Sequence, residues 1–239
     1  MKYKLKYTRF NEYSILIEWP SIIDENILEN ILKFKNFIVI NSVKLKLDII
    51  NTYNSILVVY DNDIEDAYSE KLRLHSLYLN LGTQRSIKSN IWEIPVCYDN
   101  EFAMDLESLS VAKSLSKSEI IQRHSQQIYT VYFLGFLPGF LYLGGLHDSL
   151  HCDRKSRPKL DVKKGAIGIG GNQTGIYPQD SPGGWHIIGS SPINFFNPMN
   201  ENPCFVKAGD KIKFQQVSKE KYVEILRQVE SHNYKPKCI

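Results

Sequence analysis

The spacing of apolar residues in the first 87 positions is typical of a small domain of strands and helices. Tyr13–Trp19 is apolar and rich in β-branched residues, which predicts a strand. Asp24 is a suitable N-cap for a following helix, because apolar residues then recur at helical spacing. This pattern ends at Lys35–Asn36, and the β-rich run Phe37–Ile40 predicts the next strand. The apolar positions of the predicted helix are Ile27, Leu28, Ile31 and Leu32.

Two further strands and a second helix complete this predicted domain. Val43–Ile49 alternates apolar and charged residues, and Ile56–Tyr60 is a short apolar run, so both are predicted strands. A helix beginning near Ile64 would place His75 at the edge of the core rather than in a ligand position. Its predicted inner face consists of Ile64, Tyr68, Leu72, His75 and Leu79.

A polar segment at residues 82–90 predicts a boundary between a domain of residues 1–87 and a domain of residues 88–239. The second domain starts with the strand-like run Ile91–Tyr98. Two short helices follow, the first over Asp105–Ala112. The second opens with a capping box, in which Ser116 and Glu119 each satisfy a free backbone N–H of the other.

Beyond Gln127 the helical period disappears, and short apolar runs alternate with Gly and Pro, which predicts a β-barrel. The exception is Ser218–Glu230, a predicted surface helix. The fold class is therefore predicted to be α+β, a small N-terminal α+β domain followed by a β-barrel domain. The inner face of the last helix is predicted to be Tyr222, Ile225, Leu226 and Val229.

Composition and charge exclude several classes of function. The 239 residues carry a formal net charge of only +3, with 29 basic and 26 acidic side chains spread along the chain, so a nucleic-acid partner is not expected. The start MKYKLKYTRF lacks the apolar core of a signal peptide, and no apolar run is long enough to span a membrane. We expect a cytoplasmic protein without a membrane partner.

The cysteines and histidines do not have the spacing of a metal site. The four cysteines form no CxxC pair, and the six histidines are scattered, so neither zinc nor a disulfide framework is expected. Cys97 lies in an apolar strand and is predicted to be a buried packing residue. We expect four free thiols and no metal.

Three consecutive stretches resemble the 5-oxoprolinase B-subunit family, also called the KipI family. They are IPVCYDNEFAMDLESL at 94–109, VYFLGFLPGFLYLGGL at 131–146 and GAIGIGGNQTGIYPQDSPGGWHIIG at 165–189. The resemblance covers roughly residues 92–200 and implies that the barrel domain is cyclophilin-like. It also implies a function as the B subunit of an ATP-dependent 5-oxoprolinase, which opens 5-oxo-L-proline to L-glutamate.

The family works through partners, so the resemblance implies a homologous C subunit and an A subunit. ATP is used by such a complex, and the sequence does not identify the protein that binds it. Two alternatives follow from related proteins. One is a KipI-type inhibitor that binds a sporulation histidine kinase. The other is a component of a biotin-dependent urea carboxylase or allophanate hydrolase-like system.

Two positions depart from the pattern of the family before the glycine-rich stretch. Lys159 stands where Arg is expected, and Lys163 stands where Pro is expected. Lys keeps the charge of Arg but cannot clamp a carboxylate or phosphate through two parallel hydrogen bonds. We therefore expect the anion site at this position to be altered.

Two Pro-Gly turns have either a structural or a functional explanation. Pro138–Gly139 and Pro182–Gly183 both have the residues preferred at the two central positions of a type II turn. Such turns can shape a barrel, or they can present backbone N–H groups to an anionic or carbonyl oxygen.

The glycines between 165 and 175 match no Walker or dinucleotide-binding loop. They can permit close packing within the barrel or close approach of a substrate. Gln173 and Thr174 follow them with an amide and a hydroxyl, which favours the substrate.

The other polar side chains of the glycine-rich stretch can orient a small polar ring. We predict a substrate-binding cleft but identify no catalytic residue. A triad of Ser181, Asp180 and either His124 or His186 would need an assumed geometry. His124 is interpreted as a hydrogen-bonded core histidine, with a proton shuttle as the alternative. The predicted cleft consists of Pro138, Gly139, Lys159, Gln173, Thr174, Tyr177, Ser181 and Trp185.

Overall fold

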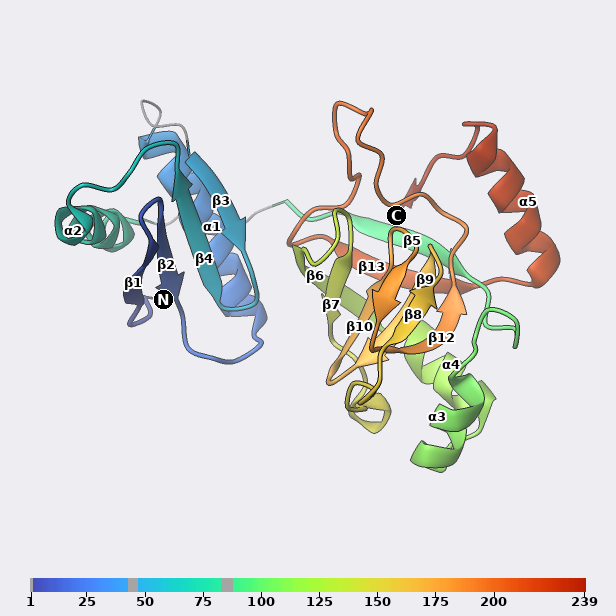
Figure 1. Ribbon diagram of the computed structural model, residues 1–239. Coiled ribbons are helices and arrows are strands. Elements are labelled where there is room, and N and C mark those ends of the chain that lie inside the picture. The colour runs from blue at the N-terminus through green and yellow to red at the C-terminus, as the bar shows by residue number, and fades with distance from the viewer. Residues whose placement is uncertain (1, 43–46, 83–87) are drawn as a thin grey trace. The chain divides into compact units, whose positions relative to one another are not determined.

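The computed structural model describes residues 2–42, 47–82 and 88–239 and divides the chain into two compact units, residues 1–88 and 89–239. The sequence placed the boundary between residues 87 and 88. Parts of the predicted strand from Val43 and of the predicted linker at 82–90 lie outside the described residues. Each unit is described by itself below (Figure 1).

The first unit is an antiparallel four-stranded sheet with two helices, and its strand order is β1-β2-β4-β3. Ile15 and Ile17 of β2 and Ile56 and Val58 of β4 are buried in its core together with residues of the helices. The elements are β1 (Lys6–Asn11), β2 (Ser14–Glu18), α1 (Glu25–Asn41), β3 (Leu47–Asn51), β4 (Ser55–Tyr60) and α2 (Ala67–Leu79).

Helix α1 starts as predicted but runs through the segment predicted as a strand. Asp24 is its N-cap, and its carboxylate accepts hydrogen bonds from the N–H groups of Asn26 and Ile27. The prediction of a strand over Phe37–Ile40 is wrong, because Ile38 continues the buried stripe of the helix. Burial of this stripe against the sheet outweighs the β-branched composition. The buried face includes Ile27, Ile31, Phe34 and Ile38.

Helix α2 buries a different face from the one predicted. Leu74 and Tyr78 are buried, whereas Tyr68 and Leu72 of the predicted inner stripe are 69% and 51% exposed. His75 is also exposed rather than at the core edge. The reason is that α2 carries apolar residues on two faces, and the face with Tyr78 also offers a hydroxyl that donates to Asn30 of α1 at 2.9 Å.

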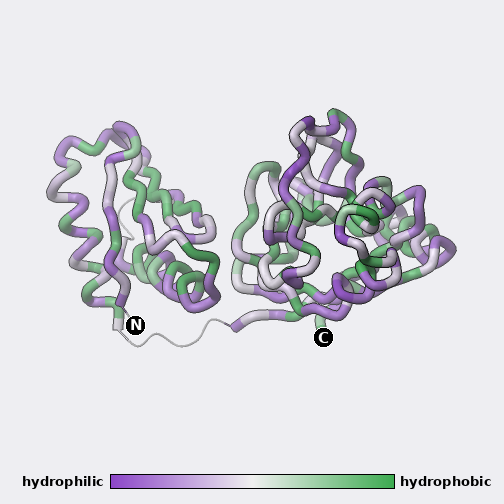
Figure 2. The backbone as a smooth tube through the Cα atoms, turned by 90° about the horizontal axis from the view of Figure 1, so that it is seen from below, coloured by the Kyte–Doolittle hydropathy of each residue, from purple (hydrophilic) through white to green (hydrophobic). Residues whose placement is uncertain are grey.

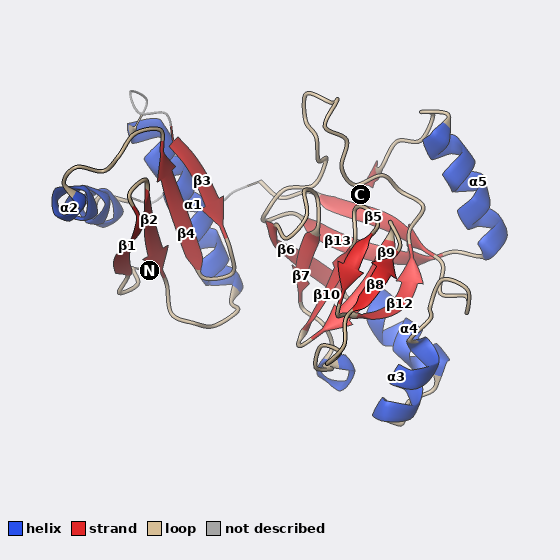
Figure 3. Cartoon of the chain, viewed as in Figure 1, coloured by secondary structure: helices blue, strands red, loops and turns tan. Residues whose placement is uncertain are grey.

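The second unit contains an eight-stranded sheet, a two-stranded sheet and three α-helices (Figure 3). The strand order of the large sheet is β12-β9-β10-β7-β6-β13-β5-β14. Its strands are β5 (Ile91–Val96), β6 (Ile128–Leu134), β7 (Leu141–Gly144), β9 (Ala166–Gly170), β10 (Gln173–Ile176), β12 (His186–Ser190), β13 (Lys211–Gln216) and β14 (Lys237–Cys238). The other elements are α3 (Leu106–Lys113), α4 (Lys117–Ser125), the 3₁₀ helix η1 (Asp148–Leu150), β8 (Lys159–Val162), β11 (Ser181–Gly183) and α5 (Lys219–Glu230).

The mixed helix and strand composition agrees with the predicted α+β class, but a cyclophilin-like barrel is not confirmed. The strand ladders leave the large sheet open between β12 and β14. One isolated bridge pairs Cys97, just after β5, with Ser190 at the end of β12. Cys97 is fully buried, as the sequence predicted.

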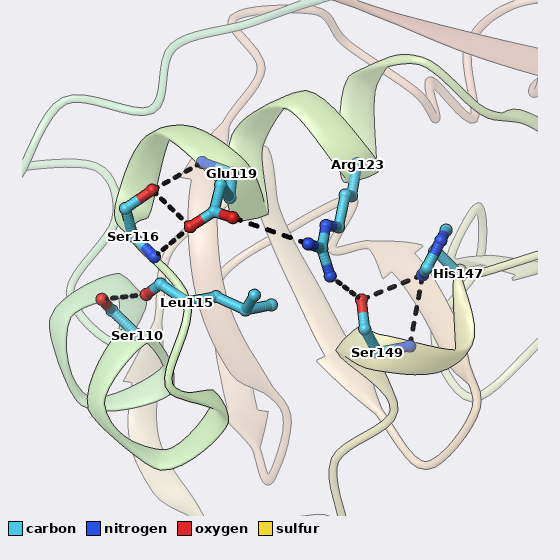
Figure 4. A network of polar contacts seen from close by, with 7 residues as sticks. All are labelled: Ser110, Leu115, Ser116, Glu119, Arg123, His147 and Ser149. Carbon is cyan, nitrogen blue, oxygen red and sulfur yellow. Dashed lines mark hydrogen bonds and ion pairs between the residues drawn. The ribbon is translucent and has the colours of Figure 1, made fainter.

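The capping box at the start of α4 is confirmed (Figure 4). The hydroxyl of Ser116 accepts from the N–H of Glu119 at 3.2 Å, and the Glu119 carboxylate accepts from the N–H of Ser116 at 2.8 Å. Further along the helix, Arg123 donates to the hydroxyl of Ser149 at 2.8 Å, and Ser149 also bonds His147. These contacts fix the end of α4 to the loop that carries η1.

Polar and hydrophobic residues alternate along the chain in both units (Figure 2). Helix α5 follows this pattern, with Tyr222 and Ile225 buried and Leu226 and Val229 half-buried, which confirms its predicted inner face. Within the described parts of the chain, no helix combines the length and the apolar character needed to cross a bilayer.

Candidate active site

A hollow of about 320 Å³ lies between the turn after β6 and the turn at β11 in the second unit. Five aromatic side chains form most of its wall, and they contact one another in edge-to-face or tilted geometry. Arg154 and Lys155 are the charged residues that line it. The aromatic residues are Phe136, Phe140, Tyr142, Tyr177 and Trp185.

The indole of Trp185 rests on glycines of β9 and β10, and only glycine fits beneath it. A Cβ atom on Gly170 would lie 2.6 Å from Cδ1 and Nε1 of Trp185, and a Cβ on Gly175 would lie 2.8 Å from Cζ3. A Cβ on Gly168 would lie 3.0 Å from the Cβ of Trp185. The glycine-rich stretch therefore makes room for a side chain of the protein itself. The expectation that these glycines admit a substrate is corrected for these three positions.

The Pro-Gly turn after β6 is held by packing at Gly139. Gly139 has φ +86°, and a Cβ there would lie 2.5 Å from the Cβ of Phe196, so glycine is required for both reasons. Pro138 is exposed at the tip of this turn, and Phe140 turns back into the aromatic wall. The turn thus forms one rim of the hollow.

The pKa values of two phenols that line the hollow depend on burial and on a nearby positive charge. Burial raises the pKa of Tyr142 and of Tyr177 above their ordinary value, because a buried phenolate loses its hydration. The nearby Arg154 opposes this rise in the pKa of both residues. Both phenols are therefore neutral at physiological pH.

The predicted site residues are only partly brought together. Tyr177 and Trp185 line the hollow, and the turn of Pro138 and Gly139 leads into it. Ser181 is buried in β11 next to the hollow, where its hydroxyl donates to the carbonyl of Pro182 at 3.1 Å.

Lys159 does not line the hollow. Its Nζ lies 3.8 Å from Oδ1 of Asp105, the N-cap residue of α3. Sequence reasoning chose Lys159 and missed Arg154 and Lys155, which do face the hollow. The segment DRKSR at 153–157 contains three basic residues immediately before the resemblance to the family resumes, and this was the available signal.

Thr174 points to the opposite side of β10, into the core. Its hydroxyl donates to the carbonyl of Gly168 at 2.9 Å and accepts from Nε2 of His124 at 2.9 Å. Nδ1 of His124 in turn accepts from the hydroxyl of Tyr98 at 2.8 Å. Burial lowers the pKa of His124 from 6.5 to about 3. His124 is therefore a neutral, hydrogen-bonded core histidine, as preferred from the sequence, and Thr174 belongs to the core rather than to the hollow.

Gln173 lies on the other face of β10, opposite Gly170 in the ladder. It is 6% exposed, and its Nε2 is buried without a hydrogen-bond partner among the described residues. The neighbouring Gly175 shares this face, which Trp185 covers. Gln173 therefore lies on the glycine face covered by the indole, and it is not among the residues that line the hollow.

The serine triad considered from the sequence is not assembled. Ser181 bonds its neighbour Pro182, and Asp180 bonds Lys163 at 3.1 Å. His186 donates from Nε2 to the carbonyl of Asp153 at 3.0 Å, and His124 is enclosed in the core. No pair among these groups has the contact that nucleophile activation requires.

A larger hollow of about 890 Å³ lies in the first unit beside the start of α2. Its acidic groups already serve the fold. Asp66 caps α2 by accepting from two backbone N–H groups, and Glu70 accepts two hydrogen bonds from Arg73 and one from the hydroxyl of Tyr60. The aromatic hollow of the second unit is therefore the better candidate site.

Comparisons with known proteins identify the family of the chain. Residues 5–206 match the family described as carboxyltransferase domain, subdomain C and D. The B subunit of the 5-oxoprolinase of Bacillus subtilis is 43% identical over 136 residues, and this alignment covers 57% of each chain. The matched region thus spans little more than half the length of this curated relative.

Two solved structures are longer than this chain and contain its fold. The crystal structure of TTHA0988 has a TM-score of 0.74 and 28% identity, and the match covers 86% of this chain and 40% of that one. The urea amidolyase of K. lactis has a TM-score of 0.84 at 17% identity, and the match covers all of this chain and 16% of that one. The second likeness concerns the fold alone. The chain belongs to the carboxyltransferase-domain family, subdomain C and D.

Proposed function

We propose that this chain is the B subunit of a cytoplasmic, ATP-dependent 5-oxoprolinase, a hydrolase complex that opens 5-oxo-L-proline to L-glutamate. The identity of 43% to the 5-oxoprolinase B subunit of Bacillus subtilis is the observation that carries this proposal. The hollow beside Trp185 supports it, because its aromatic walls and basic groups suit a small polar ring.

The chain is proposed to act with a homologous C subunit and an A subunit and to be inactive alone. The residues around the hollow include no activated nucleophile, which fits a site completed by a partner. The longer chain of TTHA0988, of which this fold is 40%, supports a further domain as neighbour. ATP is proposed to bind elsewhere in the complex.

Reconstitution tests the proposal. The chain is co-expressed with its candidate C and A subunits, and glutamate release from 5-oxo-L-proline is measured with and without ATP. We expect ATP-dependent release that disappears when this chain is omitted. A stable three-protein complex without release would refute the proposal, and so would full activity in the absence of this chain.

A second candidate is carboxyl transfer in a urea carboxylase-type system. A urea amidolyase of Lachancea kluyveri is 22% identical over 247 residues and aligns with 91% of this chain. This function requires a biotin carrier, so a biotin-dependent transfer of carboxylate by the reconstituted proteins would favour it over lactam opening.

We also propose that the second unit closes into the cyclophilin-like barrel. The bridge between Cys97 and Ser190 supports this closure, since each residue donates its N–H to the carbonyl of the other at 2.9 Å. Slow hydrogen exchange at both amides is expected, and exchange as fast as in a loop at either amide would count against closure.

A further inference from the structure

The charged residues that line the aromatic hollow are both basic. Arg154 and Lys155 are its charged lining residues, and no carboxylate is among the described residues that line it. Arg154 is exposed at the edge of the hollow, beside its apolar wall. The hollow therefore favours an anionic group at its basic edge.

Arg154 is free to bind such an anion. Its guanidinium carbon lies 5.7 Å from the ring centroid of Trp185, in the geometry of a cation–π contact. No carboxylate in the described parts of the chain lies within ion-pair distance of it. A guanidinium stacked by its face keeps its N–H edges available for two parallel hydrogen bonds to a carboxylate.

Lys155 holds the segment of Arg154 in place. Its Nζ contacts Oδ2 of Asp105 at 2.5 Å, and the same oxygen accepts from the N–H of Ile187 at 2.7 Å. The backbone N–H of Lys155 donates to the carbonyl of Gly184 at 2.8 Å, next to Trp185. The residue beside Arg154 is thus fixed at both its side chain and its backbone, and the exposed guanidinium of Arg154 lies over the ring of Trp185.

The aromatic wall sets the shape of the ligand. Phe140 and Tyr142 meet Trp185 edge-on, with ring centroids 5.5 Å and 5.7 Å from that of the indole. Stacking and edge contacts of this kind favour a flat or slightly puckered ring over an extended chain. The volume of about 320 Å³ accommodates one small ring with its substituents.

We propose that this hollow binds a small ring compound with a single carboxylate, in which Arg154 pairs with the carboxylate and the ring lies against Trp185. This inference deepens the proposed function and rests on it for the identity of the ligand, since 5-oxo-L-proline is such a compound. All the proposed contacts lie within this chain, so binding requires no other protein of the complex.

Titration of the isolated full chain tests the inference. Binding of 5-oxo-L-proline, of pyrrolidin-2-one, which lacks the carboxylate, and of acetate, which lacks the ring, is measured by ligand-detected NMR and tryptophan fluorescence. We expect 5-oxo-L-proline to bind about tenfold more tightly than either fragment. Arg154→Gln should weaken its binding by about tenfold, and Arg157→Gln, an exposed basic residue of the same segment, should leave it unchanged.

Several results would overturn the inference. These are no saturable binding at millimolar concentration, equal binding of the lactam with and without its carboxylate, or unchanged binding by the Arg154→Gln protein with an unaltered melting temperature. The reconstituted complex separates this inference from the proposed function. If the complex opens 5-oxo-L-proline but the isolated chain binds no ligand, the inference is refuted and the proposed function stands. Selective binding without turnover would refute the proposed function alone.

Discussion

Nε2 of His124 donates to the hydroxyl of Thr174 across 2.9 Å in the core of the second unit. Because the only hydroxyl proton of Thr174 is donated to Gly168, the imidazole must carry its proton on Nε2. Nδ1 is then an acceptor, which the hydroxyl of Tyr98 satisfies. Helix α4 is thereby joined to the glycine-rich strands by a fully satisfied chain of hydrogen bonds.

The first prediction concerns pH. The pKa of His124 is lowered from 6.5 to about 3 by burial, so the unfolded chain binds the proton more tightly than the folded chain between these values. The contribution of His124 to stability is therefore fully present above pH 6.5 and is lost as the pH falls toward 3. In this range it changes the free energy of unfolding by up to about 1.4 kcal/mol per pH unit. Denaturant unfolding measured across this range should show a shallower slope in His124→Asn. The exposed His147→Gln serves as control and should keep the slope of the original protein.

Thr174→Val should destabilise the second unit. The substitution leaves the Nε2 proton of His124 buried without a partner and removes a hydrogen bond to the carbonyl of Gly168, at a cost of about 1 to 3 kcal/mol in the free energy of unfolding. Thr174→Ser keeps the hydroxyl and should cost about 1 kcal/mol. Thermal and denaturant melts measure both. Binding of 5-oxo-L-proline should persist in the serine variant, and a loss of binding without a loss of stability would place Thr174 in the site after all.

Gly170→Ala should displace Trp185. The added methyl group would lie 2.6 Å from the indole, and such overpacking typically costs about 1 to 3 kcal/mol. A shift of tryptophan emission toward longer wavelength should accompany the lower melting temperature, because the indole becomes more exposed. Gly184→Ala is the control, since its nearest contact would be at 3.7 Å. Equal behaviour of the two variants would argue against the glycine floor.

The ion pair of Asp105 and Lys155 should be strongly coupled. Their side chains are 10% and 17% exposed, and Asp105 also accepts a backbone hydrogen bond. A double-mutant cycle with Asp105→Asn and Lys155→Met should give a coupling energy of about 2 kcal/mol or more. The exposed pair of Lys163 and Asp180 should give less than about 1 kcal/mol in the same experiment. A coupling no larger than that of the exposed pair would remove Lys155 as the anchor of Arg154.

Features that depend on residues close together in the chain could be predicted from the sequence. Features that depend on tertiary packing could not. Asp24 and Ser116 were correctly identified as helix starts, because a cap involves residues only two or three positions away. The strand at Phe37–Ile40 was predicted wrongly, because only the packed sheet shows that Ile38 faces the core. Local composition cannot decide between a helix and a strand in such a short apolar run.

The candidate site shows the same division. The turn at Gly139 and the position of Trp185 followed from local chemistry and from the resemblance to the family. The face of β10 to which Thr174 points did not, because it depends on which side of the sheet the core occupies. Arg154 escaped notice because its contact with Trp185 joins positions 31 residues apart in the chain.

The parallel pairing of β5 with β13 joins residues 91–96 to residues 211–216. Asp210 strengthens this junction, since its buried carboxylate accepts from the N–H of Asn90 and from the indole of Trp92 at 3.0 Å each. During synthesis the first unit has all of its described strands and helices once residue 79 has left the ribosome. Strand β5 must wait for about 115 more residues before its partner exists, and such long-range closure slows folding. The pairing of β5 with β13 is therefore expected to form late, after most of the second unit has been synthesised.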